Sequence, residues 1–325
     1  MHKLVKQLWD SGSVISRRIR CVSLGGNRKE VGWVMAEIDI VPSGEPLGAD
    51  VLGLDARTMQ DDETMAMVRA AFALHGVLCF RDQCLDERQL IAFTQQFGEI
   101  ESYVLSDYAL KDYPEILIVS NIVEDDGPIG LMDAGTTWHT DMSYITAPPA
   151  ATLLYAKEVP VDEDGETVGN TLFASTAAAY DALPDAMKTR LAGRCTTHSY
   201  EAKHARRAQE GKSNRKPISK AQRDSLPPVD HPVIRTHAES GRQCIYVVAG
   251  ECQGITGIPD DEAEELLEML AAHCVKPEFH YRHKWRVGDV LIWNNCLVQH
   301  LALHDYALPQ RRLMLRTTVQ GSVPR

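Results

Sequence analysis

The sequence predicts a mixed α+β protein that is mainly β, with a sandwich or jelly roll of short strands and helices packed outside it. Two observations support this fold class. Amphipathic helical patterns precede the strands that carry the candidate site residues, and those strands are short and separated by turn residues. The chain has 325 residues and 44% hydrophobic residues, enough to bury a substantial core.

The first half of the chain alternates short strands with amphipathic helices. A helix is expected over 61–75, because acidic residues open it, Met65 and Val68 fall on its apolar face, and Gly76 ends it. The other elements expected in this half are a strand at 37–41, a buried strand at 77–80, a helix from Asp86 to Gly98, and a buried strand at 116–119.

The second half is richer in strands. A strand containing His139 is expected to break at Pro148-Pro149, because proline removes a backbone donor. The remaining expected elements are strands at 151–155, 233–236, 243–248, 278–285, 290–293 and 313–319, a helix at 176–192, and an acidic helix that Asp260 and Asp261 begin.

Two segments differ from the rest in composition. Residues 1–34 carry seven Lys or Arg and are expected to be a disordered or dispensable extension, ahead of a single domain over 35–325. Residues 9–12 interrupt the only candidate signal sequence. An insertion is expected at about 200–228, where 203–223 hold eight basic residues. It is either a solvated surface segment or a lid that attracts an anionic substrate.

Composition narrows the functional classes. The net charge of −11 argues against a general nucleic-acid-binding protein. The eight cysteines contain no Cys-x-x-Cys pair, which is typical of buried thiols in a reducing compartment, so a cytoplasmic location is expected. No apolar run approaches the length of a membrane span. We therefore expect neither a nucleic acid nor a membrane as a partner.

The stretch from Trp138 to Asp141 contains a possible metal motif. In an extended strand, side chains two residues apart lie on one face, so His139 and Asp141 would point together. They would form two thirds of a 2-His-1-carboxylate site, which is typical of non-haem Fe(II) oxygenases. His300, after the strand at 290–293, is a candidate third ligand, although each residue alone is equally compatible with an ordinary structural role.

Two arginines near the C-terminus strengthen this interpretation. Arg312 and Arg316 share strand parity, so both guanidinium groups could enter one cavity. Arginine binds carboxylates bidentately, and two buried arginines are costly unless anions meet them. The alternative is a surface pair with salt-bridge partners.

Taken together, these stretches resemble the taurine dioxygenase family of Fe(II)/2-oxoglutarate-dependent oxygenases, which includes the aryloxyalkanoate dioxygenases. The resemblance covers roughly 38–325 in family order. The matching stretches are Arg81-Asp82-Gln83, Phe97-Gly98-Glu99, Trp138-His139-Thr140-Asp141 with Ala147-Pro148-Pro149-Ala150, Thr171-Leu172-Phe173-Ala174-Ser175 with Ala178-Ala179-Tyr180, His231-Pro232-Val233 with Thr236-His237, Trp293-Asn294-Asn295 with Gln299-His300, and Arg311-Arg312 with Arg316.

The resemblance implies a double-stranded β-helix fold, related to jelly rolls and cupins. It implies that His139, Asp141 and His300 ligate Fe(II), and no catalytic residue is expected beyond these ligands. It also implies 2-oxoglutarate and O2 as co-substrates, and a homo-oligomer, either a dimer or a tetramer.

The same resemblance assigns the anion-binding residues. Arg312 would pair with the distal carboxylate of 2-oxoglutarate and Thr171 would hydrogen-bond it, with Thr167 as a rival in a lengthened loop at 161–170. Arg316 would lie near the metal and meet an acidic group of the substrate.

The chain departs from the taurine-specific pattern at the substrate-binding positions. Tyr103 and Ser106 stand where the taurine enzymes have a His and a Tyr that bind sulfonate, and Gly135 stands where they have an Asn. Asn294 replaces a common Asp. The first three differences point away from taurine, and Tyr103 favours an aryl or aryloxy acid.

The sequence therefore predicts a dioxygenase that hydroxylates a small anionic molecule and forms succinate and CO2. The substrate would be a sulfonate, a sulfate ester, or an aryloxy or other carboxylic acid. One alternative is a metal-dependent hydrolase, because zinc accepts the same ligands. The arginine pair argues against it, since hydrolysis needs no dicarboxylate. The other alternative is a catalytically silent small-molecule binding protein.

Overall fold

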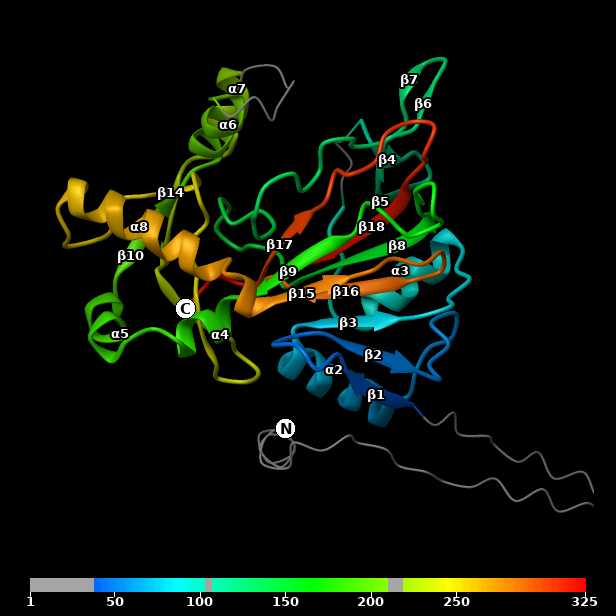
Figure 1. Ribbon diagram of the computed structural model, residues 1–325, viewed down its shortest axis with the longest axis horizontal. Helices are drawn as coiled ribbons and strands as arrows, with labels where there is room; N and C mark the ends of the chain where they lie inside the picture. The colour runs from blue at the N-terminus through cyan, green and yellow to red at the C-terminus, as the bar shows by residue number, and fades with distance from the viewer. Residues whose placement is uncertain (1–37, 103–106, 210–218) are drawn as a thin grey trace, which may run out of the picture.

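Two β-sheets facing each other form the centre of the computed structural model, which describes residues 38–102, 107–209 and 219–325 (Figure 1). The large sheet has eight strands in the order β1 (Asp39–Pro42), β2 (Ala49–Leu52), β3 (Val77–Phe80), β16 (Val290–Asn294), β8 (Ala151–Glu158), β18 (Leu313–Val319), β5 (Tyr113–Ser120) and β4 (Ala109–Leu110). The small sheet has the order β15 (His280–His283), β9 (Thr171–Ser175) and β17 (Val298–Ala302). This arrangement confirms the prediction of a mainly β jelly-roll core.

The alternation of side chains along the strands produces two separate cores. In β8, Leu153 and Tyr155 pack against one face, with helices α2 (Asp62–His75) and α3 (Glu87–Gln95). Leu154 and Ala156 point the opposite way, into the space between the two sheets. Strand β8 therefore links the outer helical layer to the interior in which the candidate site lies.

The two outer helices begin and end where the sequence indicates. The Asp61 side chain accepts a hydrogen bond from the Thr64 backbone N–H, and Gly76 ends α2 in a left-handed conformation with φ 68°. Asp86 and Gln89 form a complete capping box at the start of α3. Local chemistry thus fixes both helices, although α3 ends at Gln95 rather than at Gly98.

A third core lies beside the sandwich, where helices pack on a hairpin. The helix expected over 176–192 is wrong as one element, because Pro184 interrupts it and begins a second helix. The elements of this region are α4 (Thr176–Asp181), α5 (Asp185–Leu191), β12 (Ile234–Thr236), β13 (Gln243–Ile245), α8 (Asp260–Cys274) and the short 3-10 helix η1 (Pro277–Phe279).

The remaining elements are β6 (Val123–Glu124), β7 (Gly127–Pro128), β10 (Cys195–His198), α6 (Tyr200–Gln209), α7 (Lys220–Ser225), β11 (Val229–Pro232) and β14 (Cys252–Gln253). Most of them lie on the same side of the sandwich as α8, whereas β6 and β7 lie on the far side, beside β4 and β5 (Figure 1). Helices α6 and α7 belong to the insertion expected at about 200–228, of which 210–218 lie outside the described residues, as does the extension at 1–34. Within the described part of the chain, no helix combines the length and apolar character needed to cross a membrane.

The expectation of a strand around His139 is also wrong. His139 forms one isolated bridge to His300, with His139 N–H donating to His300 O at 3.1 Å and His300 N–H donating to His139 O at 2.8 Å. A turn follows immediately, and Met142 adopts a left-handed φ of 49°. Two backbone hydrogen bonds and a turn, rather than the face of a strand, thus place His139 and Asp141.

The packing of α3 on the large sheet gives a direct test of the outer core. Phe93 is buried and lies edge-on to Phe80 and Phe97, at centroid distances of 5.0 and 5.5 Å. We expect Phe93→Ala to lower the free energy of unfolding by about 3–5 kcal/mol in urea denaturation, because it leaves a cavity. Met59→Ala, at an exposed position, is the control. A loss below about 1 kcal/mol for Phe93→Ala would contradict this packing.

Candidate active site

His139, Asp141 and His300 meet between the two sheets. One ligand atom from each lies within 4.8 Å of the others, and the two imidazole rings are 4.1 Å apart between centroids. His300 is on β17, and its backbone bridge holds His139 beside it. The structure thus brings together the three residues that the sequence predicted as ligands, although they are 161 positions apart at the extremes.

Three strands of the large sheet hold the Asp141 carboxylate, which is only 3% exposed. Thr152 on β8 donates to Oδ2 at 2.7 Å, and the Trp293 indole on β16 donates to the same oxygen at 3.3 Å. Arg316 on β18 pairs with Oδ1 at 2.9 Å. Burial alone would raise the pKa of Asp141, but the positive charge of Arg316 lowers it below its ordinary value.

The imidazole groups are prepared as neutral ligands. His139 Nδ1 lies 2.8 Å from the Thr137 carbonyl, which can only accept, so Nδ1 carries the proton and Nε2 keeps its lone pair. That Nε2 faces Asp141 Oδ1 at 3.9 Å. Burial, with help from neighbouring positive charge, lowers the pKa of His139 to about 3 and of His300 to about 4.

This donor set fits a divalent iron ion. The site offers two neutral imidazoles and one ionised carboxylate, and the buried Nδ1 of His300 has no hydrogen-bond partner among the described residues. Two imidazoles and a carboxylate form the set used by non-haem Fe(II) oxygenases. The hydrogen bonds of His139 to Thr137, and of Asp141 to Thr152 and Trp293, fix the orientation of the two side chains before a metal binds.

Arg312, four residues before Arg316, is a buried arginine without a carboxylate partner among the described residues. Arg312 immediately precedes β18, is 4% exposed, and its Nε has no hydrogen-bond partner in the described part of the chain. Burial lowers the pKa of Arg312, and only Tyr306, which its guanidinium group hydrogen-bonds, opposes that shift. A positive charge so enclosed is costly unless an anion meets it, and none of the described carboxylates forms an ion pair with Arg312.

Thr171 and Arg312 share one neighbour, the indole of Trp285. Trp285 Nε1 donates to Thr171 Oγ1 at 3.0 Å, and the Arg312 guanidinium carbon lies 6.0 Å from the indole centroid. Thr167, the rival in the sequence, instead pairs with Val161 across an isolated bridge in the preceding loop. The structure therefore places Thr171, and not Thr167, at the indole that Arg312 contacts.

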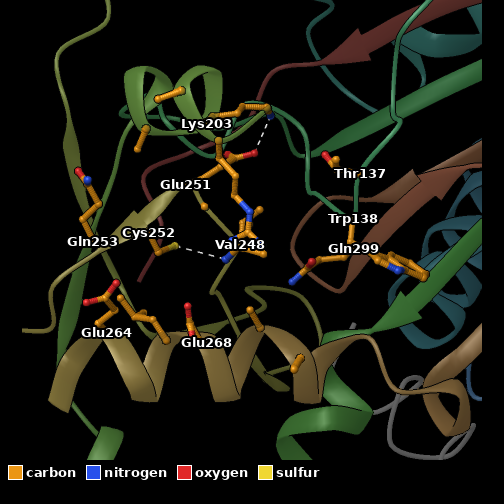
Figure 2. Close-up of a pocket in the computed structure, with 18 of the residues that line it drawn as sticks. Thr137, Trp138, Lys203, Val248, Glu251, Cys252, Gln253, Glu264, Glu268 and Gln299 are labelled. Atoms are coloured by element: carbon orange, nitrogen blue, oxygen red, sulfur yellow. Dashed lines mark hydrogen bonds and ion pairs between the residues drawn. The ribbon is translucent and has the colours of Figure 1, made fainter. Parts of the chain in front are cut away.

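A large cavity of about 1430 Å³ is lined by Trp138 and Gln299, next to two of the three candidate ligands in the chain (Figure 2). Trp138 and Gln299, the chain neighbours of His139 and His300, line it, while the three ligand side chains are not part of its wall. Residues of α6 and α8 form opposite walls. The cavity therefore adjoins the site at Trp138 and Gln299, and not at the side chains of His139, Asp141 and His300.

An ion pair forms part of the wall of this cavity. Glu251 is 2% exposed, and it accepts from Lys203 Nζ at 2.6 Å and from Ser143 Oγ at 2.7 Å. The Lys203 ammonium also lies 5.2 Å from the centroid of Tyr144, in the turn that follows Asp141. Through Lys203 and its partner Glu251, α6 is thereby connected to the turn that carries Asp141.

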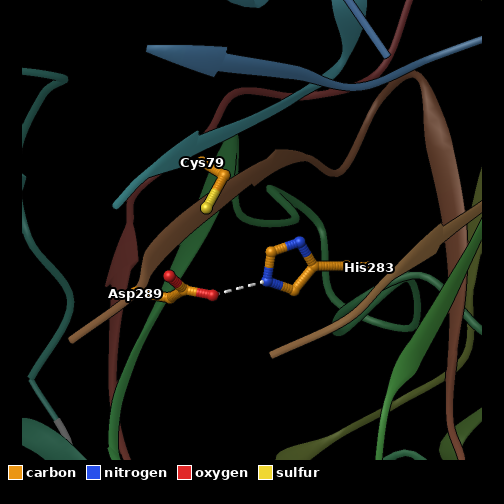
Figure 3. Close-up of side chains that lie close together, drawn as sticks. All are labelled: Cys79, His283 and Asp289. Carbon is orange, nitrogen blue, oxygen red and sulfur yellow. Dashed lines mark hydrogen bonds and ion pairs between the residues drawn. The ribbon is translucent and has the colours of Figure 1, made fainter. Parts of the chain in front are cut away.

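A second group of possible ligands, Cys79, His283 and Asp289, has a different character (Figure 3). Arg81 Nη1 pairs with Asp289 Oδ2 at 2.6 Å, and His283 Nε2 lies 3.2 Å from the same oxygen. Burial raises the pKa of the Cys79 thiol and lowers that of His283. Because the Arg81 guanidinium group already balances the Asp289 carboxylate and burial favours the neutral thiol, this cluster is described best as a buried ion-pair network around Asp289.

Comparison with known proteins decides the family. The family model for the taurine catabolism dioxygenase TauD, TfdA family matches residues 39–318. The chain belongs to this family. The dioxygenase is 35% identical to the alpha-ketoglutarate-dependent 2,4-dichlorophenoxyacetate dioxygenase of Burkholderia sp. (strain RASC), over 76% of this chain and 82% of that protein. It is 32% identical to pentalenolactone F synthase of Streptomyces arenae, over 86% of this chain and 93% of that protein.

Solved structures agree with this assignment. A taurine dioxygenase from Burkholderia xenovorans superposes with a TM-score of 0.72 at 30% identity, covering 88% of this chain and 90% of that one. The protein is an Fe(II)-dependent dioxygenase that consumes 2-oxoglutarate and O2. The sequence prediction of this reaction class is confirmed, and neither the hydrolase nor the binding-protein alternative finds support among the relatives.

The predicted substrate residues of the dioxygenase have different outcomes. Tyr103 and Ser106 lie outside the described residues. Gly135 lies beside the site: its φ is +77°, and a Cβ there would be 3.2 Å from Ala302 Cβ and 3.5 Å from His139 Cε1. A side chain at this position would thus crowd the edge of the His139 ring.

Sequence reasoning missed three residues of this region. Trp285, Lys203 and Glu251 gain their importance only from contacts with distant segments. The Trp285 signal was limited to an aromatic residue in an expected strand, and Lys203 was one of eight basic residues with nothing to distinguish it.

The hydrogen bond from Thr152 gives a test of how Asp141 is held. We expect Thr152→Val, which keeps the shape but removes the donor to Oδ2, to weaken Mn(II) binding by about 10- to 100-fold in calorimetric titration. Thr176→Val is the control, because Thr176 is also buried and its hydroxyl has no hydrogen-bond partner among the described residues. Equal Mn(II) affinity in the Thr152 variant and the control would contradict the importance of this hydrogen bond.

Proposed function

We propose that the protein hydroxylates a small anionic organic molecule at an iron held by His139, Asp141 and His300. In this reaction, 2-oxoglutarate and O2 yield succinate and CO2, and one oxygen atom enters a C–H bond of the substrate. The observation that carries the proposal is the buried carboxylate with two neutral imidazoles, beside a fixed arginine. When bound, the iron supplies the activation of O2 that is coupled to loss of CO2.

We assign the co-substrate to Arg312 and Thr171. The distal carboxylate of 2-oxoglutarate would meet the Arg312 guanidinium group, whose burial without a carboxylate partner is otherwise costly. Thr171 Oγ1 would add a hydrogen bond to the same carboxylate. Bidentate arginine recognition explains a preference for a dicarboxylic 2-oxoacid.

The protein's own groups then have distinct tasks. Thr137 fixes the His139 tautomer, so that Nε2 faces the metal position. Thr152 and Trp293 hold Asp141 Oδ2 and leave Oδ1 directed toward His139 and Arg316. Burial between the sheets excludes bulk water from the reacting groups, which limits unproductive side reactions.

Arg316 and the cavity together define the substrate class. We propose that Arg316, 2.9 Å from Asp141, receives the acidic group of the substrate close to the metal. The body of the substrate would occupy the cavity of about 1430 Å³, which exceeds what taurine needs. Gly135 would leave room at the edge of His139, and Tyr103 and Ser106 would complete the substrate pocket. These features favour an aryloxy acid, a sulfate ester or a larger sulfonate over taurine.

We further propose that the enzyme acts in the cytoplasm as a homo-oligomer, a dimer or a tetramer, that it binds neither nucleic acid nor membrane, and that residues 1–34 are dispensable. The scattered cysteines and the net charge of −11 support the location and the lack of nucleic-acid binding.

The ligand assignment predicts a spectroscopic change. Under anaerobic conditions, Fe(II) and 2-oxoglutarate should give a weak visible charge-transfer band, and His139→Ala should abolish it because one ligand is missing. His304→Ala, at an exposed histidine, should leave the band intact. An unchanged band in the His139 variant would show that His139 is not a ligand.

The substrate class predicts a charge requirement. Succinate formation should be stimulated by aryloxy acids, sulfate esters or sulfonates, and should fall about tenfold or more for methyl esters of the active acids. A lost hydrogen bond to a charged group costs about 1.5–3 kcal/mol, which accounts for that factor. Turnover confined to neutral or cationic compounds would rule out an anionic substrate.

A further inference from the structure

Trp285 contacts both groups that we assign to the co-substrate carboxylate. It is fully buried between β15 and β16, its indole N–H donates to Thr171 Oγ1 at 3.0 Å, and its ring lies 6.0 Å from the Arg312 guanidinium carbon. None of these contacts involves the metal ligands. The Trp285 side chain thus contacts both Thr171 and Arg312, the two residues of the proposed carboxylate site.

The direction of the hydrogen bond determines what Thr171 can do. A threonine hydroxyl has one proton to donate and two lone pairs that accept, whereas an indole N–H can only donate. Because Trp285 occupies a lone pair of Thr171, the hydroxyl proton is left to point elsewhere. A carboxylate, which only accepts, is the matching partner. The same indole, near the limiting distance for a cation–π contact, also limits where the Arg312 guanidinium group can lie.

The indole itself has little freedom to move. The Trp285 backbone N–H donates to Asn170 Oδ1 at 3.2 Å. The His283 ring packs edge-on against the indole, with centroids 4.5 Å apart and an interplanar angle of 84°. Figure 3 shows His283 directed toward Asp289, with His283 Nε2 3.2 Å from Asp289 Oδ2. The buried ion-pair network therefore supports one face of Trp285.

We infer that Trp285 is a positioning residue for 2-oxoglutarate, which orients the Thr171 hydroxyl and the Arg312 guanidinium group toward the distal carboxylate. This inference rests on the proposed assignment of Thr171 and Arg312. It adds a role for a residue that touches neither the iron position nor, by this account, the co-substrate. It also gives a functional reason for the buried network of Arg81, His283 and Asp289.

A double-mutant cycle tests the inference through binding rather than turnover. Affinity would be measured calorimetrically on Mn(II)-loaded protein, with 2-oxoglutarate and with 2-oxopentanoate, which lacks the distal carboxylate. We expect Trp285→Phe, which keeps an aromatic ring without the N–H, to weaken 2-oxoglutarate binding about 3- to 10-fold. Thr171→Val should weaken it at least as much, and adding Trp285→Phe to Thr171→Val should have little further effect. Thr171→Ser, which keeps the hydroxyl group, should bind 2-oxoglutarate as tightly as the wild type.

The controls separate positioning from general packing. Binding of 2-oxopentanoate should be the same in all variants, because it makes no use of the carboxylate site. If Trp285→Phe lowers the thermal midpoint substantially, replacement of Trp285 alone by 3-benzothienylalanine, which exchanges only the N–H for sulfur, should give the same loss of 2-oxoglutarate affinity. Weakening of 2-oxopentanoate to the same extent would overturn the inference.

The possible failures are distinguishable. If Thr171→Val and Arg312→Gln both leave 2-oxoglutarate affinity unchanged, the proposed co-substrate site is wrong. If those two variants weaken binding but the Trp285 variants match the wild type, the co-substrate site stands and only the role of Trp285 is overturned. A Trp285 effect that persists in full on the Thr171→Val background would show that Trp285 does not act through Thr171.

Discussion

The site depends on the hydrogen bonds and the ion pair that stabilise the buried carboxylate of Asp141. A carboxylate that is 3% exposed is costly unless it is paired and hydrogen-bonded. Here three adjacent strands of the large sheet each supply one partner, Thr152 from β8, Trp293 from β16 and Arg316 from β18. The register of these strands therefore fixes the carboxylate, and the carboxylate in turn faces the His139 imidazole.

The two arginines near the C-terminus solve opposite electrostatic problems. Arg316 is balanced within the protein, because it pairs with Asp141. Arg312, four residues earlier and more deeply buried, pairs with no described carboxylate, and its pKa is lowered by that burial. The fold thus leaves one enclosed guanidinium group without a carboxylate partner beside Trp285, and in the function that we propose the distal carboxylate of 2-oxoglutarate supplies that partner. The cavity lined by Trp138 and Gln299 does not include Arg312, Thr171 or Trp285 in its wall, so the places that we propose for substrate and co-substrate differ.

Local sequence signals predicted the local structure well and the long-range contacts poorly. The ends of α2 follow from Asp61 and Gly76, and the split of the helix at 176–192 could have been read from Pro184. The expected strand around His139 failed because a backbone bridge to His300, 161 residues away, replaces it. Trp285 could not be singled out, because the role that we infer for it depends on its contact with Thr171, which is 114 residues earlier in the chain.

In the candidate site, too, the sequence pointed to residue types and motifs but not to long-range contacts. The residue types and their family order pointed to His139, Asp141 and His300, which the structure brings together, and Thr171 rather than Thr167 lies against Trp285. The roles of the first three as ligands stay predictions. No pattern distinguished Lys203 from the other basic residues of its segment, because only its pairing with buried Glu251 does so. The roles of Tyr103 and Ser106 stay predictions from the resemblance alone.

The most direct test of the central claim is metal binding by Asp141→Asn. Asparagine keeps the size of the side chain and one oxygen acceptor for Thr152 and Trp293, but removes the charge that a divalent cation needs. Calorimetric titration with Mn(II), alongside the thermal midpoint, separates loss of the site from loss of the fold. The account predicts a folded protein whose Mn(II) binding is abolished. Wild-type Mn(II) affinity in the folded variant would contradict it.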